Sequence, residues 1–103
     1  MGEEFTELVR VYLEDTPKRL VQLEQAAQQD NRKDLVAYSH SLKSTSANLG
    51  ALQLSELAKQ IEHGARNGSL SQPLALVTQL QKEYQRVAKE LSQIVTSQLV
   101  TKI

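Results

Sequence analysis

The segment Tyr38–Ala51 reads YSHSLKSTSANLGA and combines a histidine, a lysine three residues later and a run of small side chains. On a helix with about 100° per residue, apolar side chains gather within about 40° of the direction opposite His40. These side chains are Leu35, Leu42, Leu49 and Tyr38. Lys43, Ser44 and Ala47 instead lie within about 60° of His40. The segment therefore predicts a helix that buries its leucines and exposes an imidazole, a cation and small residues.

The composition fits one soluble globular domain. The chain has 103 residues, of which 40% are hydrophobic, and this length suffices for a single modest core. Its 12 basic residues are balanced by 12 acidic ones, which argues against a nucleic-acid-binding protein, since such domains are usually strongly basic. Neither an apolar run of membrane-spanning length nor a signal peptide is recognisable. The absence of cysteine excludes disulfides, thiolate metal sites and a cysteine nucleophile, and it is compatible with a reducing cytosol.

Helix-forming residues and evenly spaced apolar positions predict an all-α protein. Helices are expected over residues 3–14, 17–29, 32–49, 52–66 and 71–98. Asp15-Thr16-Pro17 could end the first helix and begin the second, although the sequence leaves open whether Pro17 breaks or only kinks the chain there. Short connections make successive helices antiparallel. We therefore predict a single domain over residues 1–103, an antiparallel up-down four-helix bundle with an additional short N-terminal helix.

His40 is the first candidate for chemistry. A random histidine is more often a surface residue without a role, but His40 lies opposite the apolar stripe and has Lys43 one turn away. An exposed imidazole is mostly neutral at pH 7 and therefore nucleophilic, while a lysine can hold an anion. This combination, with open access, suits attack on a phosphoryl group. His63, near the end of the helix 52–66, is better explained by helix-dipole stabilisation, and two histidines without a third ligand argue against a metal site.

At these residues the sequence resembles the histidine-containing phosphotransfer (HPt) domain family. The family pattern is a histidine, any residue, Leu-Lys, and small residues that end in Leu-Gly-Ala. The segment His40–Ala51 reads HSLKSTSANLGA and follows this pattern. One departure is Ser44, where many members have glycine; serine is also small, so access to His40 is expected to persist. The segment YLEDTP at residues 12–17, the chain length and the number of helices extend the resemblance over nearly the whole chain.

The resemblance implies a phosphorelay intermediate in two-component signal transduction. His40 would accept a phosphoryl group from the aspartyl phosphate of a response-regulator receiver domain and pass it to an aspartate of another receiver. Lys43 would stabilise the phosphoryl group, and Ser44, Ala47 and Gly50 would keep the site open. The receiver would supply Mg²⁺, so the domain itself would bind no cofactor and would have no ATP-dependent kinase activity.

The same resemblance implies a cellular setting. We expect a cytoplasmic monomer that binds receiver domains, with no nucleic-acid partner and no membrane span in this chain. A bacterial hybrid sensor histidine kinase is a plausible parent protein, and it could tether the domain to the inner membrane.

Three further residues are candidates for a partner-docking surface. Val36 and Ala37 flank His40 on the helical wheel, and apolar groups beside an exposed reactive residue indicate a partner surface. Val36 could equally pack against a neighbouring helix. Gln60 is included because family members often have a glutamine on the next helix that supports the histidine region.

Two other functions compete with this interpretation. The dimerisation domain of a histidine kinase also carries its histidine on a bundle helix, but it typically has an acidic residue directly after the histidine, where this chain has Ser41. A glycine-rich nucleotide-binding loop is also missing from the sequence. The alternative from another class is a helical scaffold or adaptor that binds partners without phosphorylation.

Overall fold

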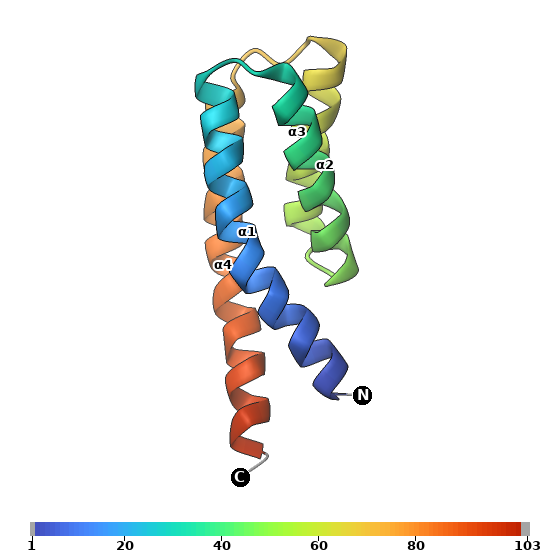
Figure 1. The fold of residues 1–103 in the computed structure, drawn as a ribbon, viewed down its shortest axis with the longest axis vertical. Coiled ribbons are helices and arrows are strands. Elements are labelled where there is room, and N and C mark those ends of the chain that lie inside the picture. Colours follow the sequence, from blue (N-terminus) through green and yellow to red (C-terminus); the bar gives the residue numbers. More distant parts are fainter. Residues whose placement is uncertain (1, 102–103) are drawn as a thin grey trace.

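The computed structural model describes residues 2–101, with side chains for residues 3–96, and every element in this range is an α-helix. The elements are α1 (Gly2–Gln28), α2 (Arg32–Asn48), α3 (Leu52–Asn67) and α4 (Pro73–Thr101). Consecutive helices run antiparallel, and α1 also packs against α4, which closes the bundle (Figure 1). The predicted all-α, antiparallel up-down bundle is therefore confirmed over the described part of the chain.

The predicted separate N-terminal helix is wrong, because α1 runs without interruption through Pro17. A proline inside a helix has no N–H for the carbonyl four residues earlier, here that of Leu13. The Tyr84 hydroxyl donates a long hydrogen bond, 3.5 Å, to this Leu13 carbonyl oxygen. Burial raises the pKa of Tyr84 to about 12, so the hydroxyl keeps the proton that it donates. Packing against α4 thus supplies a partner that the local sequence lacks, and the helices expected at 3–14 and 17–29 form one element.

Because α1 is continuous at Pro17, a Pro17→Ala substitution is expected to stabilise the fold. Alanine restores an N–H for the Leu13 carbonyl and removes the ring from the helix interior, while the unfolded chain gains conformational freedom, so the net gain is about 1 kcal/mol. Urea unfolding of the two proteins measures the difference. Lys18→Ala, at the exposed neighbouring position, is the matched control and is expected to change the unfolding free energy by less than about 0.5 kcal/mol. A less stable Pro17→Ala variant would contradict this account.

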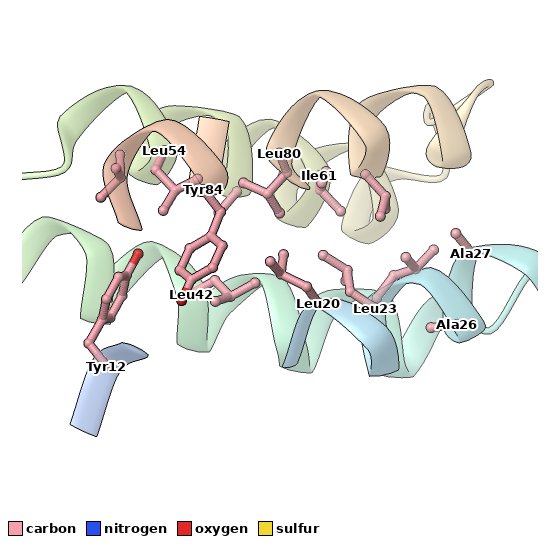
Figure 2. Packing of buried hydrophobic residues seen from close by; sticks show 14 of the residues in the cluster. Tyr12, Leu20, Leu23, Ala26, Ala27, Leu42, Leu54, Ile61, Leu80 and Tyr84 are labelled. Carbon is pink, nitrogen blue, oxygen red and sulfur yellow. The ribbon is translucent and has the colours of Figure 1, made fainter. Parts of the chain in front are cut away.

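The core contains buried apolar side chains from all four helices (Figure 2). Its largest fully buried members are Leu23, Leu42, Leu54, Ile61 and Leu80. In α4 an apolar seam with alternating spacings of three and four residues is buried from Val77 to Leu91. Ile94, the next position of this seam, is 39% exposed, because α4 has 29 residues and extends beyond the end of the shorter α3. One continuous core therefore holds the four helices together.

The buried face of α2 is rotated slightly from the predicted leucine stripe. Leu35 and Leu42 are buried as expected, whereas Tyr38 and Leu49 are only partly buried at its margin. Their place in the interior is taken by two fully buried serines, Ser39 and Ser46. The Ser39 hydroxyl donates to the Leu35 carbonyl of the same helix, and the Ser46 Oγ lies 2.8 Å from the Tyr12 hydroxyl oxygen. Both buried hydroxyl groups thus have hydrogen-bond partners. Because serine is small, it leaves room for the neighbouring helices to approach α2 closely.

Among the described residues, no helix has both the length and the apolar character needed to cross a membrane.

Candidate functional site

α2 presents His40 to solvent. The helix begins at Arg32 because the Asn31 side chain caps it: the Asn31 Oδ1 accepts a 3.1 Å hydrogen bond from the backbone N–H of Asp34. With the opposite face of α2 packed in the core, the His40 side chain is 56% exposed. The predicted exposure of His40 is therefore observed.

Contacts near both ends of the α2–α3 pair fix how the two helices align. The Arg32 guanidinium at the start of α2 donates to backbone carbonyl groups in the last turn of α3. Near the other end, the Ser55 Oγ donates a 2.8 Å hydrogen bond to the Lys43 carbonyl oxygen. In this alignment the α3 residue that contacts His40 is Glu62.

Glu62 is the centre of a four-residue cluster of His40, Lys43, Glu62 and Arg66, which we call the Glu62 cluster. Its side chain is only 3% exposed. The Glu62 Oε2 lies 2.8 Å from the His40 Nδ1 and 2.9 Å from the Arg66 Nη2, while the Oε1 lies 2.7 Å from the Lys43 Nζ. A buried carboxylate thus joins the two residues selected on α2 to a second cation on α3.

The Glu62 carboxyl is ionised under ordinary conditions. Burial by itself raises its pKa, but the polar contacts of Lys43, Arg66 and His40 outweigh burial and lower the pKa from 4.5 to about 2. The carboxylate carries a full negative charge at neutral pH, where it balances one of the two neighbouring cations. The side chains of Lys43 and Arg66 therefore leave a net positive charge beside His40.

The contact with Glu62 also selects the tautomer of His40. An ionised carboxylate can only accept hydrogen bonds, so the His40 Nδ1 must carry the hydrogen that it donates to the Glu62 Oε2. In the neutral ring, the lone pair then resides on Nε2. Within residues 3–96, no side chain or backbone group forms a hydrogen bond with this Nε2. The site therefore offers an imidazole with one nitrogen oriented by a carboxylate and, in the neutral ring, the other available as a nucleophile.

The lowered pKa of Glu62 predicts a specific loss of stability in acid. A carboxyl group whose pKa falls on folding stabilises the folded state when the pH is above its pKa in the unfolded chain, near 4.5. This contribution disappears as the pH falls through its pKa in the folded state, about 2. We expect the unfolding free energy of the wild type to exceed that of Glu62→Gln by up to about 3 kcal/mol at pH 7. This difference should shrink steadily between pH 4.5 and pH 2, as urea unfolding at several pH values would measure. A difference that stays constant over this window would contradict the pKa assignment.

The other residues predicted around His40 take different positions. Ser44 and Ala47 are exposed on α2, as expected for small residues on the His40 side. Gly50 lies beyond the end of α2 with a φ of +77°, and a Cβ added there would meet no atom within 4 Å. The left-handed backbone conformation therefore explains why a glycine suits position 50. The structure does not show that Gly50 keeps space open for a ligand.

The three residues predicted for docking have different environments in the structure. Val36 is partly buried and packs against the core, which favours its alternative role as a contact to a neighbouring helix. Ala37 is exposed beside it on α2. Gln60 is exposed on α3, but the α3 side chain that contacts His40 is Glu62, two residues later. His63 is exposed, and its side chain forms no hydrogen bond or ion pair with a residue of the Glu62 cluster.

Glu62 and Arg66 were missed as site residues at the level of sequence. Their spacing of four residues on an amphipathic helix was the available signal, because it places an acid and a base on one face. It did not indicate that this face points at His40, since that depends on the alignment of α2 with α3. The carboxylate beside His40 thus comes from α3, whereas the position directly after His40 is Ser41.

The described part of the chain contains no group of three or more histidine, cysteine, aspartate or glutamate residues that could hold a metal ion. The Glu62 cluster has a single carboxylate, and two cations already occupy it.

Comparisons with known proteins agree with this geometry. The family model of the Hpt domain matches residues 7–90, a range that includes the whole Glu62 cluster. The chain is also similar to the solved structure of the histidine-containing phosphotransfer protein B (HptB) from Pseudomonas aeruginosa PAO1. The two are 31% identical, the match covers 94% of this chain and 84% of that one, and the TM-score is 0.89. No curated protein sequence matches significantly.

The match of a family model over most of the sequence and the likeness to HptB establish the family. Hpt domains take part in histidine phosphotransfer within phosphorelays and interact with response-regulator receiver domains. The all-α bundle and the exposed histidine on α2 are what such a domain requires. The chain belongs to the Hpt domain family.

Proposed function

We propose that this domain is a phosphorelay intermediate that accepts a phosphoryl group on His40 from the aspartyl phosphate of one receiver domain and passes it to an aspartate of another. The observation that carries this proposal is the 2.8 Å contact between the His40 Nδ1 and the Glu62 Oε2. It orients an exposed imidazole and leaves Nε2 as its nucleophilic nitrogen.

Each transfer can proceed without moving a proton. The lone pair of the His40 Nε2 forms the N–P bond while the P–O bond to the receiver aspartate breaks, and the carboxylate leaves with the electron pair. The ring keeps its Nδ1 hydrogen and gains positive charge, which the Glu62 carboxylate 2.8 Å away stabilises. In the second step an aspartate of another receiver attacks phosphorus, the N–P bond breaks and the neutral imidazole is restored.

Lys43 supplies positive charge for the transferred group. A phosphoryl group carries about −1.5 to −2 charges at pH 7, so it is attracted to a site whose cations outnumber its one carboxylate. The Lys43 ammonium lies one helical turn from His40 and is held by the Glu62 Oε1 at 2.7 Å. Its role has two parts: it contributes to the local positive potential, and it neutralises the buried oxygen of Glu62.

The surroundings of His40 suit approach by a protein partner. Ser44 and Ala47 are small and exposed on α2, so a receiver can bring its aspartate close to the ring. Ala37 and Gln60, both exposed, are part of the proposed docking surface, with Val36 at its partly buried edge. In this proposal the receiver contributes Mg²⁺, and the domain contributes no ATP-dependent kinase activity. A cytoplasmic location, with tethering through a parent sensor kinase, belongs to the same proposal.

A three-component relay assay tests this function. A receiver carrying ³²P on its aspartate is mixed with the domain, and a second, unlabelled receiver is added after the first has been removed. We expect label on the domain that is acid-labile and base-stable, as a phosphohistidine is, and its later appearance on the second receiver. A domain that binds the receivers but takes up no label from any of several phosphorylated receivers would instead favour a scaffold.

A further inference from the structure

Arg66 is the member of the Glu62 cluster for which the proposed transfer has no role yet. It lies on α3 one turn after Glu62, and its side chain is 55% exposed. Its guanidinium donates twice to the Glu62 Oε2, from Nη2 at 2.9 Å and from Nε at 3.3 Å. Its backbone carbonyl accepts a hydrogen bond from the Arg32 side chain, which holds this turn of α3 in place. A fixed backbone with an exposed head group is well suited to reach a ligand.

The Glu62 Oε2 has more donors than it can bind well. It accepts from the His40 Nδ1 and from two nitrogens of Arg66, whereas a carboxylate oxygen offers about two lone-pair positions. The longest of the three contacts is the one from the Arg66 Nε. Arg66 is therefore the partner that Glu62 can release at least cost, because the His40 contact still satisfies the same oxygen.

Lys43 is held differently. It is the ion-pair partner of the Glu62 Oε1, an atom that is buried and has no other hydrogen-bond partner among the described residues. Moving the Lys43 ammonium away would leave this oxygen unpaired, at a considerable desolvation cost. Its side chain is also less exposed, 29% compared with 55% for Arg66. Of the two cations, Arg66 is thus the one free to turn toward an incoming anion.

Distance and chemistry both favour such a movement. The Arg66 Nη2 and the His40 Nδ1 contact the same oxygen and so lie within about 6 Å of each other. A phosphoryl group on the His40 Nε2 would be bonded to the same imidazole ring, whose Nδ1 lies within that distance of the guanidinium. Arginine presents planar paired donors that match phosphate oxygens, a geometry that lysine lacks.

We propose that Arg66 is a phosphoryl-binding residue: when the His40 Nε2 carries a phosphoryl group, the Arg66 guanidinium turns from the Glu62 Oε2 to the phosphoryl oxygens. Glu62 keeps the His40 Nδ1 hydrogen and the Lys43 ammonium throughout. No covalent bond changes in this exchange, which replaces one carboxylate partner of Arg66 by a phosphoryl partner. The inference rests on the proposed function in one respect, the phosphorylation of His40.

The test uses a small phosphodonor so that it does not depend on any receiver. With phosphoramidate, the His40 Nε2 forms a P–N bond as the donor's own P–N bond breaks and ammonia leaves with a proton from solvent. The pH titration of the phosphoryl group is then followed by ³¹P NMR in wild type, Arg66→Ala, Arg66→Lys and Arg86→Ala. Arg86 on α4 is the matched control, because it is 54% exposed and likewise paired with glutamates. His40→Gln identifies which ³¹P signal belongs to His40.

We expect Arg66→Ala to raise the titration midpoint of the phosphoryl group by about half a pH unit, since loss of an exposed cation destabilises the dianion modestly. Arg66→Lys should restore part of the shift, and Arg86→Ala should leave the midpoint at the wild-type value. A purely structural role for Arg66 would lower the urea midpoint of unfolding without moving the ³¹P titration.

The outcomes separate the two proposals. Equal titration midpoints in wild type and Arg66→Ala, with a His40 signal present in both, would overturn the role of Arg66 alone. Phosphohistidine ³¹P signals that are all retained in His40→Gln, or the absence of any phosphohistidine in the wild type, would count against phosphorylation of His40 and hence against the proposed function.

Discussion

The His40→Gln variant is expected to accept no phosphoryl group from a phosphorylated receiver. Glutamine lacks the nucleophilic ring nitrogen, so the N–P bond cannot form, and the loss of transfer should be complete within the detection limit of a ³²P assay. The fold should persist, because the His40 side chain is 56% exposed and Glu62 keeps its contacts with Lys43 and Arg66. Circular dichroism and urea unfolding of the same sample would verify this.

His63→Gln is the matched control for this experiment. It changes the other histidine of the chain, which is exposed on α3 and whose side chain forms no hydrogen bond or ion pair with Glu62. We expect it to accept label at the wild-type rate. Label that persists in His40→Gln and disappears in His63→Gln would place the phosphorylation site at His63 and refute the assignment made here.

The Lys43→Met variant is expected to lose both stability and transfer rate. Methionine keeps the apolar stem of the lysine but removes the ammonium from the buried Glu62 Oε1. An unpaired buried carboxylate oxygen should cost about 2 kcal/mol of unfolding free energy. Because the site also loses positive charge, transfer from a receiver should slow by about tenfold, less than the loss of a fully buried donor would cause. Urea unfolding and ³²P transfer kinetics measure the two effects.

A double-mutant cycle with Glu62→Gln isolates the contact. In the Glu62→Gln background the carboxylate charge is absent, so Lys43→Met should cost clearly less stability than it does in the wild type. Lys89→Met, an exposed lysine on α4, controls for the loss of a surface charge and should leave both readouts unchanged. Equal costs of Lys43→Met in both backgrounds would show that the ion pair with Glu62 does not contribute to stability, and an unchanged transfer rate would remove the electrostatic role of Lys43.

The parts of the site that the sequence predicted are those that lie on one helix. His40, Lys43, Ser44 and Ala47 are separated by one to seven residues on α2, so helical periodicity alone places them on the same side. His40, Ser44 and Ala47 are exposed in the structure and Lys43 is partly exposed, which agrees with this. Gly50 lies past the last turn of α2, where a helical wheel no longer applies, and its predicted role in access does not follow from its position.

The contacts that the sequence did not predict are those that depend on how two helices align when they pack together. Glu62 is 22 residues from His40, and a docking role was instead assigned to Gln60, which points to solvent two positions away. A shift of two residues turns a helical side chain by about 200°, so a small error in alignment exchanges a buried contact for an exposed one. Pro17 is a similar case, because the Tyr84 hydroxyl that reaches the Leu13 carbonyl comes from the far end of the chain.

The sequence by itself determined the helical class, the bundle of antiparallel helices, and the presence of a histidine and a lysine on an exposed face of α2. These features follow from local propensity and periodicity, which act over a few residues. Only the tertiary structure decided that α1 is continuous and that Glu62 contacts His40, Lys43 and Arg66 at once. The physical reason is that packing fixes the relative alignment of helices, and a buried carboxylate acquires its partners and its low pKa only from that alignment.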